Sequence, residues 1–158
     1  MLLTPHTLVG IAIGASIPNP QIAVPLAFVM HFMGDMVPHW DFYTDTTIEQ
    51  RQTGWRPIAV MADFGLGIAT GTFFTLYALW IAGDASLALN IFLCGIAAVL
   101  PDALTAPVMF SKNPNFISKL LGKIQSALQF SAPVIFGLLT QILVSAFAFL
   151  LISSSIAL

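Results

Sequence analysis

Charge is the scarcest property of this sequence. Charged residues make up 8% of its 158 positions and hydrophobic residues 58%, whereas a soluble domain carries roughly 25% charged residues. The composition therefore excludes an ordinary soluble domain. It predicts a multi-pass membrane protein.

Other absences narrow the function further. Cys94 is the single cysteine, so no disulfide can form within the chain. The net charge is -2 and the basic residues form no cluster or tail, so nucleic acid is not an expected partner. The chain also lacks Gly-x-Ser-x-Gly, a phosphate-binding glycine loop and His-Glu-x-x-His, which removes three common routes to hydrolysis or nucleotide binding.

The apolar runs predict an all-α integral membrane protein with a single membrane domain over residues 1–158. Thr4 and Pro5 indicate the start of the first helix, with Thr4 as its N-cap. We expect a two-fold repeat of helical hairpins, the first with helices short for full spans. The expected units are a helical hairpin at 1–40, a cytoplasmic polar loop at 41–57, a second helical hairpin at 58–107, an interfacial amphipathic helix at 111–129 and a C-terminal transmembrane helix at 130–157.

The repeat is visible as a shared opening. His6 and Asp63 are each followed by glycines four and eight residues later, and the two apolar runs end in Pro38-His39 and Pro101-Asp102. Glycines at this spacing allow helices in lipid to approach closely. The pattern predicts that the first and third helices cross on their glycine stripes, which would make His6 and Asp63 neighbours. The same faces could also join the chain to a second copy or to another protein.

A second polar stripe lies on the helix expected at 21–37. His31, Asp35 and His39 follow at intervals of four residues and so share one face. Ionisable groups in an apolar helix are costly and usually functional, although a hydrogen-bonded stripe inside the bundle is an alternative. Asp41 follows directly, in the pattern His39-x-Asp41.

The positions of the basic residues predict on which side of the membrane these groups lie. All five lie in two segments, and the positive-inside rule places both on the cytoplasmic side. The histidines and most carboxylates then lie near that same surface. The basic residues are Arg51, Arg56, Lys112, Lys119 and Lys123.

Imidazole and carboxylate ligands without a useful thiol suit zinc best, with manganese and iron(II) as alternatives. Six ligands are enough for one or two ions. Asp35 or Asp41 could serve as the general base, and membrane lipid is the expected partner, with Lys119 and Lys123 near its phosphate. The predicted metal ligands are His6, His31, Asp35, His39, Asp63 and Asp102.

The first 45 residues or so also resemble a known family. His6, the glycine-rich apolar helix after it and the segment Gly34-Asp35-Met36-Val37-Pro38-His39-Trp40-Asp41 are similar to the integral-membrane metal-dependent hydrolases, also described as LexA-binding inner-membrane hydrolases. The same opening looks like that of zinc-dependent phospholipase C domains, and Leu100-Pro101-Asp102 matches more loosely. The resemblance implies that His6, His39 and Asp41 belong to a metal site, and it supports Asp35. It also implies a multi-pass protein of the inner (cytoplasmic) membrane of the cell.

The chain departs from these families in its downstream half. They usually carry a second histidine-rich segment there, whereas this half has no histidine, and Gln125 and Gln129 stand in its short helix. Three functions therefore remain open. The chain is a metal-dependent hydrolase acting on a phosphate- or ester-containing lipid-like substrate, a non-catalytic membrane subunit with a structural metal or polar site, or a small transporter.

Overall fold

The computed structural model describes residues 1–110 and 113–156, and in this part of the chain it is helical without a named strand. The predicted all-α class is confirmed. Residues 111–112, which open the predicted interfacial helix and include Lys112, and residue 157 of the predicted last helix lie outside the described residues. The helices are α1 (Leu3–Ser16), α2 (Pro20–Met36), α3 (Ile48–Gln52), α4 (Arg56–Trp80), α5 (Ala85–Phe110), α6 (Phe116–Leu128) and α7 (Val134–Ile156).

Three of these helices are long and apolar enough to cross a membrane: Arg56–Trp80, Ala85–Ala106 and Val134–Ile156. Their outer faces carry large apolar side chains, with Ile58 72% and Ile135 77% exposed. Such extended apolar surfaces are unusual on a soluble monomer and suit contact with lipid. By contrast, α1 and α2 have 14 and 17 residues, or about 21 and 26 Å at 1.5 Å per residue. Both are shorter than a hydrocarbon core of roughly 30 Å.

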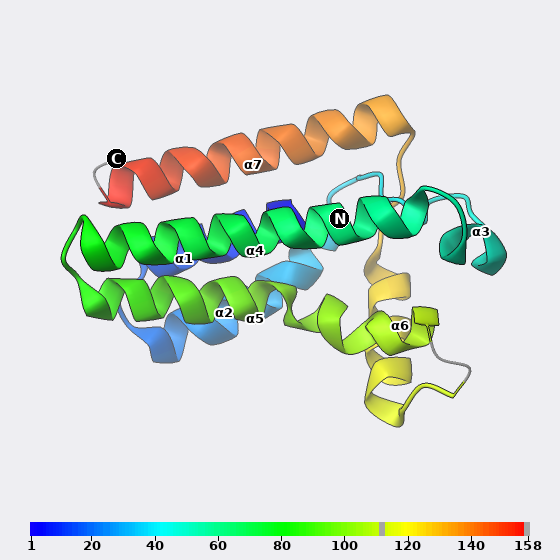
Figure 1. Cartoon of the computed structure of the whole chain (residues 1–158), viewed down its shortest axis with the longest axis horizontal. Coiled ribbons are helices and arrows are strands. Elements are labelled where there is room, and N and C mark those ends of the chain that lie inside the picture. The colour runs from blue at the N-terminus through cyan, green and yellow to red at the C-terminus, as the bar shows by residue number, and fades with distance from the viewer. Residues whose placement is uncertain (111–112, 157–158) are drawn as a thin grey trace.

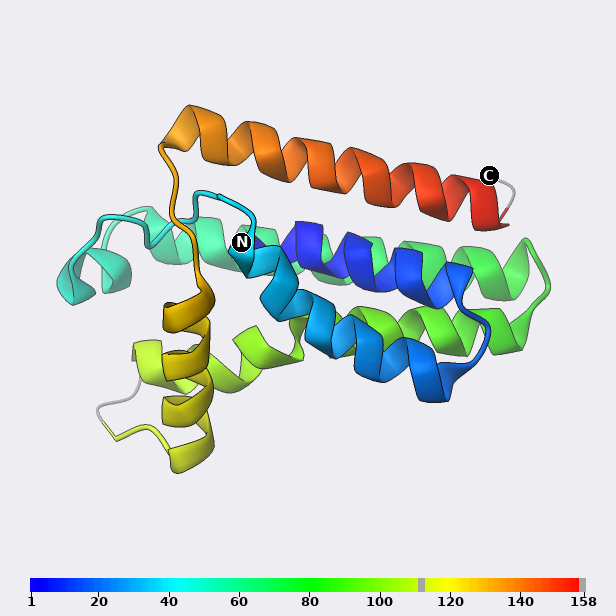
Figure 2. The same ribbon diagram turned by 180° about the vertical axis from the view of Figure 1, so that it is seen from behind.

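The short helix α1 is the centre of the bundle. It contacts α2, α4, α5 and α7. Figure 1 shows it behind α4, and Figure 2, from the other side, shows it between α7 and α2. Pro18 and Pro20 separate α1 from α2, where the Asn19 side chain accepts the Gln21 amide and so caps the second helix. The helix α2 ends at Met36, because Val37 precedes Pro38 and is extended.

Glycines let α1 approach its neighbours, but not in the predicted way. A Cβ on Gly10 would lie 2.5 Å from the Cys94 oxygen, and one on Gly14 would lie 2.9 Å from the Asn90 oxygen, so this stripe faces α5. The α4 stripe meets α1 elsewhere, since a Cβ on Gly67 would lie 3.0 Å from Thr7 Oγ1. The expectation that the two stripes face each other is therefore wrong. Within the chain, the α1 stripe is packed against α5.

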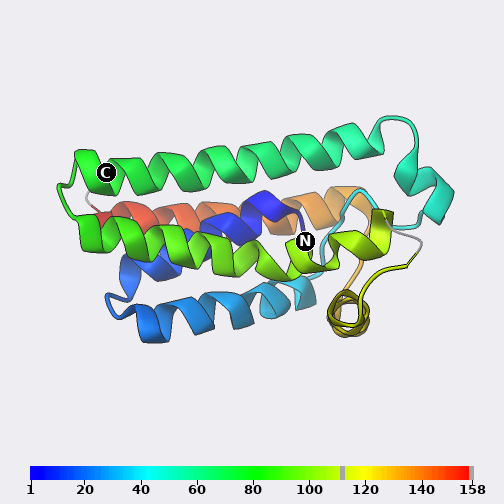
Figure 3. The same ribbon diagram turned by 60° about the horizontal axis from the view of Figure 1, so that its bottom comes forward.

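The amphipathic helix α6 differs in direction from the rest. Figure 3 views it nearly end-on while the other long helices run across the picture. The segment that follows it is tied to the end of α2 by main-chain hydrogen bonds. The Phe130 amide donates to the Asp35 oxygen at 3.0 Å, the His39 amide donates to the Phe130 oxygen at 3.0 Å, and the Ala132 amide donates to the His39 oxygen at 2.8 Å. These bonds fix one end of α6 beside the polar stripe of α2.

The glycine packing predicts different outcomes for two alanine substitutions. Gly10→Ala would press a methyl group against the α5 backbone and should lower the free energy of unfolding by about 1–3 kcal/mol, as overpacking does. Gly65→Ala is the matched control, because a Cβ there meets nothing within 4 Å. It should stabilise the α4 helix by up to about 1 kcal/mol. Unfolding of both variants in detergent tests this, and equal stability of the two would contradict the close α1–α5 contact.

Candidate metal centre

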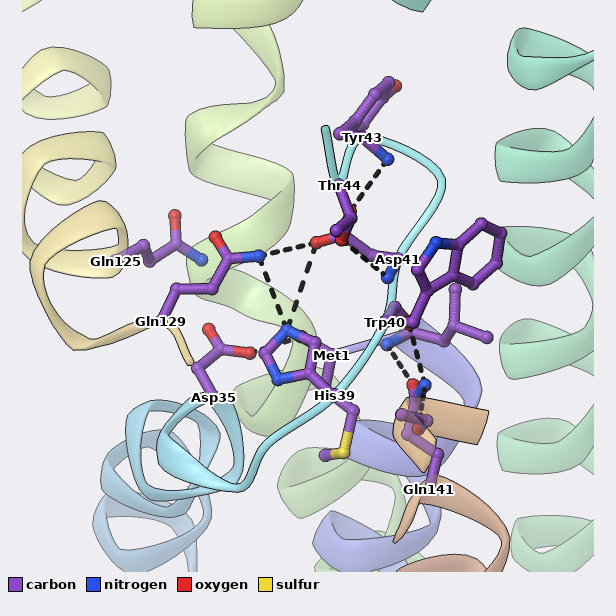
Figure 4. A network of polar contacts seen from close by, with 12 residues as sticks. Met1, Asp35, His39, Trp40, Asp41, Tyr43, Thr44, Gln125, Gln129 and Gln141 are labelled. Atoms are coloured by element: carbon purple, nitrogen blue, oxygen red, sulfur yellow. Dashed lines mark hydrogen bonds and ion pairs between the residues drawn. The ribbon is translucent and has the colours of Figure 1, made fainter. Parts of the chain in front are cut away.

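Polar side chains from four segments meet at one end of the bundle. His6 comes from the first turns of α1, His31 and Asp35 from α2, His39 from the segment after α2, and Asp102 from α5. Part of this cluster is drawn in Figure 4, where Asp35 and His39 lie close to the Gln125 and Gln129 side chains of the α6 region. His6, His31 and His39 are each at most 1% exposed. Buried ionisable groups in an apolar bundle need partners of matching chemistry.

Among the described residues, His6, His31 and Asp102 form a group that could hold a metal ion. One ligand atom from each residue can be chosen so that all lie within 4.8 Å of one another. The two imidazole rings are stacked with their centroids 4.1 Å apart. Gly34 leaves room for this arrangement, since a Cβ there would lie 3.1 Å from His6 Cε1.

Asp35 links the members of this group. Its Oδ1 lies 3.1 Å from His6 Nε2 and its Oδ2 lies 3.4 Å from His31 Nε2. His31 Nε2 also lies 3.5 Å from Asp102 Oδ1. Two ligands bound to one zinc at tetrahedral angles are separated by about 3.4 Å, given metal–ligand distances of roughly 2.0–2.1 Å. The three pairs named here have about this separation, whereas the ligand atoms of His6, His31 and Asp102 taken together spread to 4.8 Å and would have to draw closer around one ion.

Two of the imidazoles are oriented by the backbone. His31 Nδ1 lies 2.8 Å from the Ala98 oxygen, and His39 Nδ1 lies 2.8 Å from the Val37 oxygen. A carbonyl only accepts hydrogen bonds, so Nδ1 carries a hydrogen in both rings, and in the neutral form of each ring the lone pair is on Nε2. In each ring that lone pair points into the cluster. Metal-binding histidines are commonly fixed by such a bond on the other ring nitrogen.

His39 and Asp41 form a second part of the cluster. The amino group of Met1 lies 2.7 Å from His39 Nε2 and 2.5 Å from Asp35 Oδ1, while His39 Nε2 lies 3.9 Å from Asp41 Oδ2. Burial lowers the pKa of His39 below its ordinary value, and the nearby Met1 ammonium acts in the same direction. The imidazole is thus held in the neutral form that a metal ligand requires.

Asp63 has other contacts in the structure. Its Oδ2 accepts the Leu3 amide at 2.6 Å, and its Oδ1 accepts the Thr4 amide at 3.2 Å and the Thr4 hydroxyl at 2.6 Å. The carboxylate thereby caps the first turn of α1, whose amide groups have no partner within the helix. Thr4 was expected to be the N-cap, but Leu2 holds that position and makes no side-chain cap bond.

Sequence reasoning assigned no role to two glutamines that reach the cluster. Gln125 Nε2 donates to Asp102 Oδ1 at 2.7 Å and lies 2.9 Å from His31 Nε2. Gln129 Nε2 donates to Asp41 Oδ2 at 2.6 Å and lies 3.4 Å from His39 Nε2 (Figure 4). The sequence offered two signals for them: their spacing of four residues, which places both amides on one helix face, and their place in the half of the chain where the similar families carry histidines.

Comparison with known proteins adds no identity to this site. No family model, no curated protein and no solved structure matches the chain. Its function must therefore be argued from the residues themselves.

The contacts of Asp63 predict that it stabilises the fold without binding metal. Asp63→Ala should lower the free energy of unfolding by about 1–2 kcal/mol, the usual scale of a lost helix cap, and leave bound metal per chain unchanged. Asp102→Ala should instead reduce the metal content. Elemental analysis of the two folded variants distinguishes the roles. Loss of metal from a folded Asp63→Ala protein would return Asp63 to the ligand set.

Proposed function

We propose that this protein is a membrane-embedded, metal-dependent hydrolase that acts on a phosphate- or ester-containing lipid-like substrate at the cytoplasmic face of the inner membrane. The observation that carries the proposal is the compact group of His6, His31 and Asp102, whose ligand atoms lie within 4.8 Å of one another. Asp35 adds two oxygens within 3.4 Å of the imidazoles. This nitrogen and oxygen donor set favours zinc, with manganese or iron(II) as alternatives, in one or two ions.

A metal in such a site lowers the pKa of bound water and stabilises negative charge on a phosphoryl or acyl oxygen. The two candidate bases differ in what surrounds them. The Asp35 carboxylate is 6% exposed and contacts Met1, His6 and His31, so it is suited to orient ligands. Asp41 is 17% exposed and lies at the edge of the cluster, so it is better placed to accept a proton from water.

The surroundings favour a lipid-like substrate. The outer face of α6 exposes Phe116 and Leu120 beside Lys119 and Lys123. These four residues also line an open surface groove of about 590 Å³, which Val108 of α5 borders. Apolar walls with two ammonium groups suit acyl chains that carry a phosphate headgroup. Basic residues near this end also support a cytoplasmic orientation.

Burial of the cluster favours one alternative. Because His6 and His31 are each only 1% exposed, the same residues could hold a structural metal in a non-catalytic membrane subunit. A structural site is closed by protein ligands, whereas a catalytic site keeps a position for water. The two functions predict the same metal content but different activity.

The test is the His31→Ala variant of the full chain, with Cys94→Ala as the matched control. We expect about one metal ion per wild-type chain or two at most, hydrolysis of a chromogenic phosphodiester or a short-chain phospholipid, and loss of both in His31→Ala. Cys94 is buried and its Sγ contacts Asn90 at 3.9 Å, so Cys94→Ala should keep the metal and the activity. Metal without hydrolysis would support the structural role, and absence of metal from the wild type would contradict both.

A further inference from the structure

An open groove of about 530 Å³ lies between α4 and α7. Its floor is the beginning of α1, through Thr4, Pro5 and Leu8, and its walls include Leu66 of α4 and Ile142 of α7. Figure 1 shows these two long helices running alongside each other. Leu66 and Ile142 are also 57% and 62% exposed, so the groove is continuous with the apolar outer faces that suit contact with lipid.

The groove does not result from a loosely held helix, because α7 is fixed on both sides of it. Near the beginning of α7, Gln141 Nε2 donates to the Trp40 oxygen at 2.7 Å and Gln141 Oε1 accepts the Leu2 amide at 2.8 Å. Farther along the helix, Ala148 and Ile152 are buried in one apolar core with residues of α1, α4 and α5. The groove is therefore a preformed feature between two well-packed parts of α7.

The chemistry of the lining favours hydrocarbon over a polar ligand. Asp63 accepts the Leu3 and Thr4 amides and the Thr4 hydroxyl, and Gln141 is occupied by the contacts just described. Ser145, which completes the polar side chains of the described lining, is small. The charged and amide groups are thus already hydrogen-bonded within the chain, and the rest of the lining is apolar, as in sites for apolar ligands.

The length of the groove distinguishes an acyl chain from a partner helix. From Leu138 to Phe149 the lining extends about 16 Å along α7, at 1.5 Å per residue. At its deep end the centroids of the Phe149 and Phe74 rings are 6.4 Å apart, so α7 and α4 meet there. This length is about half of a hydrocarbon core of roughly 30 Å, or one leaflet. A membrane-spanning helix of a second copy or of another protein would need a surface about twice as long.

We propose that the groove between α4 and α7 binds one acyl chain of a membrane lipid from the leaflet beside the polar cluster, with the methyl end of the chain at Phe149 and Phe74. The chain fills the space between the two helices and completes their packing over α1. This site shares no lining residue with the α6 groove. It depends neither on a metal nor on the proposed hydrolysis.

Photo-crosslinking of the full chain in nanodiscs tests the site. The probes are phosphatidylcholines that carry a diazirine in one acyl chain, either near the ester or near the methyl end, and peptide mass spectrometry locates the label. We expect the probe labelled near the ester to react at Leu138 and Ile142, and the probe labelled near the methyl end to react at Phe149. The order follows from a chain that enters at the end of the groove beside the polar cluster.

Ser145→Phe should lower the labelling of groove residues on the order of tenfold, because the phenyl ring takes the space of the chain. Ser154→Phe is the matched control and should label like wild type, since Ser154 is exposed on the same helix outside the groove. If Ser145→Phe does not fold, the order of labelling in wild type still decides.

Three results would overturn the proposal. One is equal labelling of the groove and of Leu143, which is 68% exposed on α7 outside the groove, because that is the pattern of ordinary lipid contact. Another is an order of labelling along α7 that is reversed or absent. The third is a dimer without bound lipid in native mass spectrometry, which would assign the groove to a second copy of the chain.

Discussion

The structure depends on how negative charge is balanced inside an apolar bundle. Asp35 is almost fully buried and receives the amino group of Met1, whereas Asp102 contacts the imidazole of His31 and the amide of Gln125. A carboxylate in a low-dielectric site is costly unless a positive charge or several donors compensate it. A divalent cation among His6, His31 and Asp102 would supply that compensation. The metal would then contribute to the stability of this end of the bundle as well as to its chemistry.

The arrangement of the helices brings many polar side chains together at the end of the bundle that holds the His6, His31 and Asp102 cluster. The short helix α1 brings His6 to the cluster, and it packs on the longer helices through Gly10 and Gly14 and through apolar residues such as Ile11. Its glycine stripe permits close approach to α5, which carries Asp102. The tie between the 35–39 segment and residues 130–132 then holds α6 across the same end. The close packing of α1 against α5 and the assembly of the polar cluster therefore depend on the same helix contacts.

Several features of this arrangement could be predicted from the sequence. The four-residue spacing on α2 places His31 and Asp35 on one face, and the repeat predicts ligands at His6, in its first opening, and at Asp102, at the end of its second apolar run. Other features depend on tertiary structure. A glycine stripe shows that a helix can approach a neighbour closely, but not which neighbour, and Asp63 is taken up by the unpaired amides of α1. The two-fold repeat itself stays a prediction.

The glutamines of α6 are a second case in which the sequence pattern does not predict the tertiary contacts of a residue. An amphipathic pattern does not indicate that the few amides on the inner face of a helix will lie against histidines 90 or more positions away.

The central claim is that histidine and aspartate side chains of this cluster bind a metal ion, and X-ray absorption of the zinc-loaded chain tests it most directly. The account predicts a first shell of nitrogen and oxygen only, at about 2.0–2.1 Å, with the outer scattering of two imidazoles that disappears in part when His6 is replaced. A sulfur-containing shell, or a zinc spectrum without imidazole scattering, would contradict it.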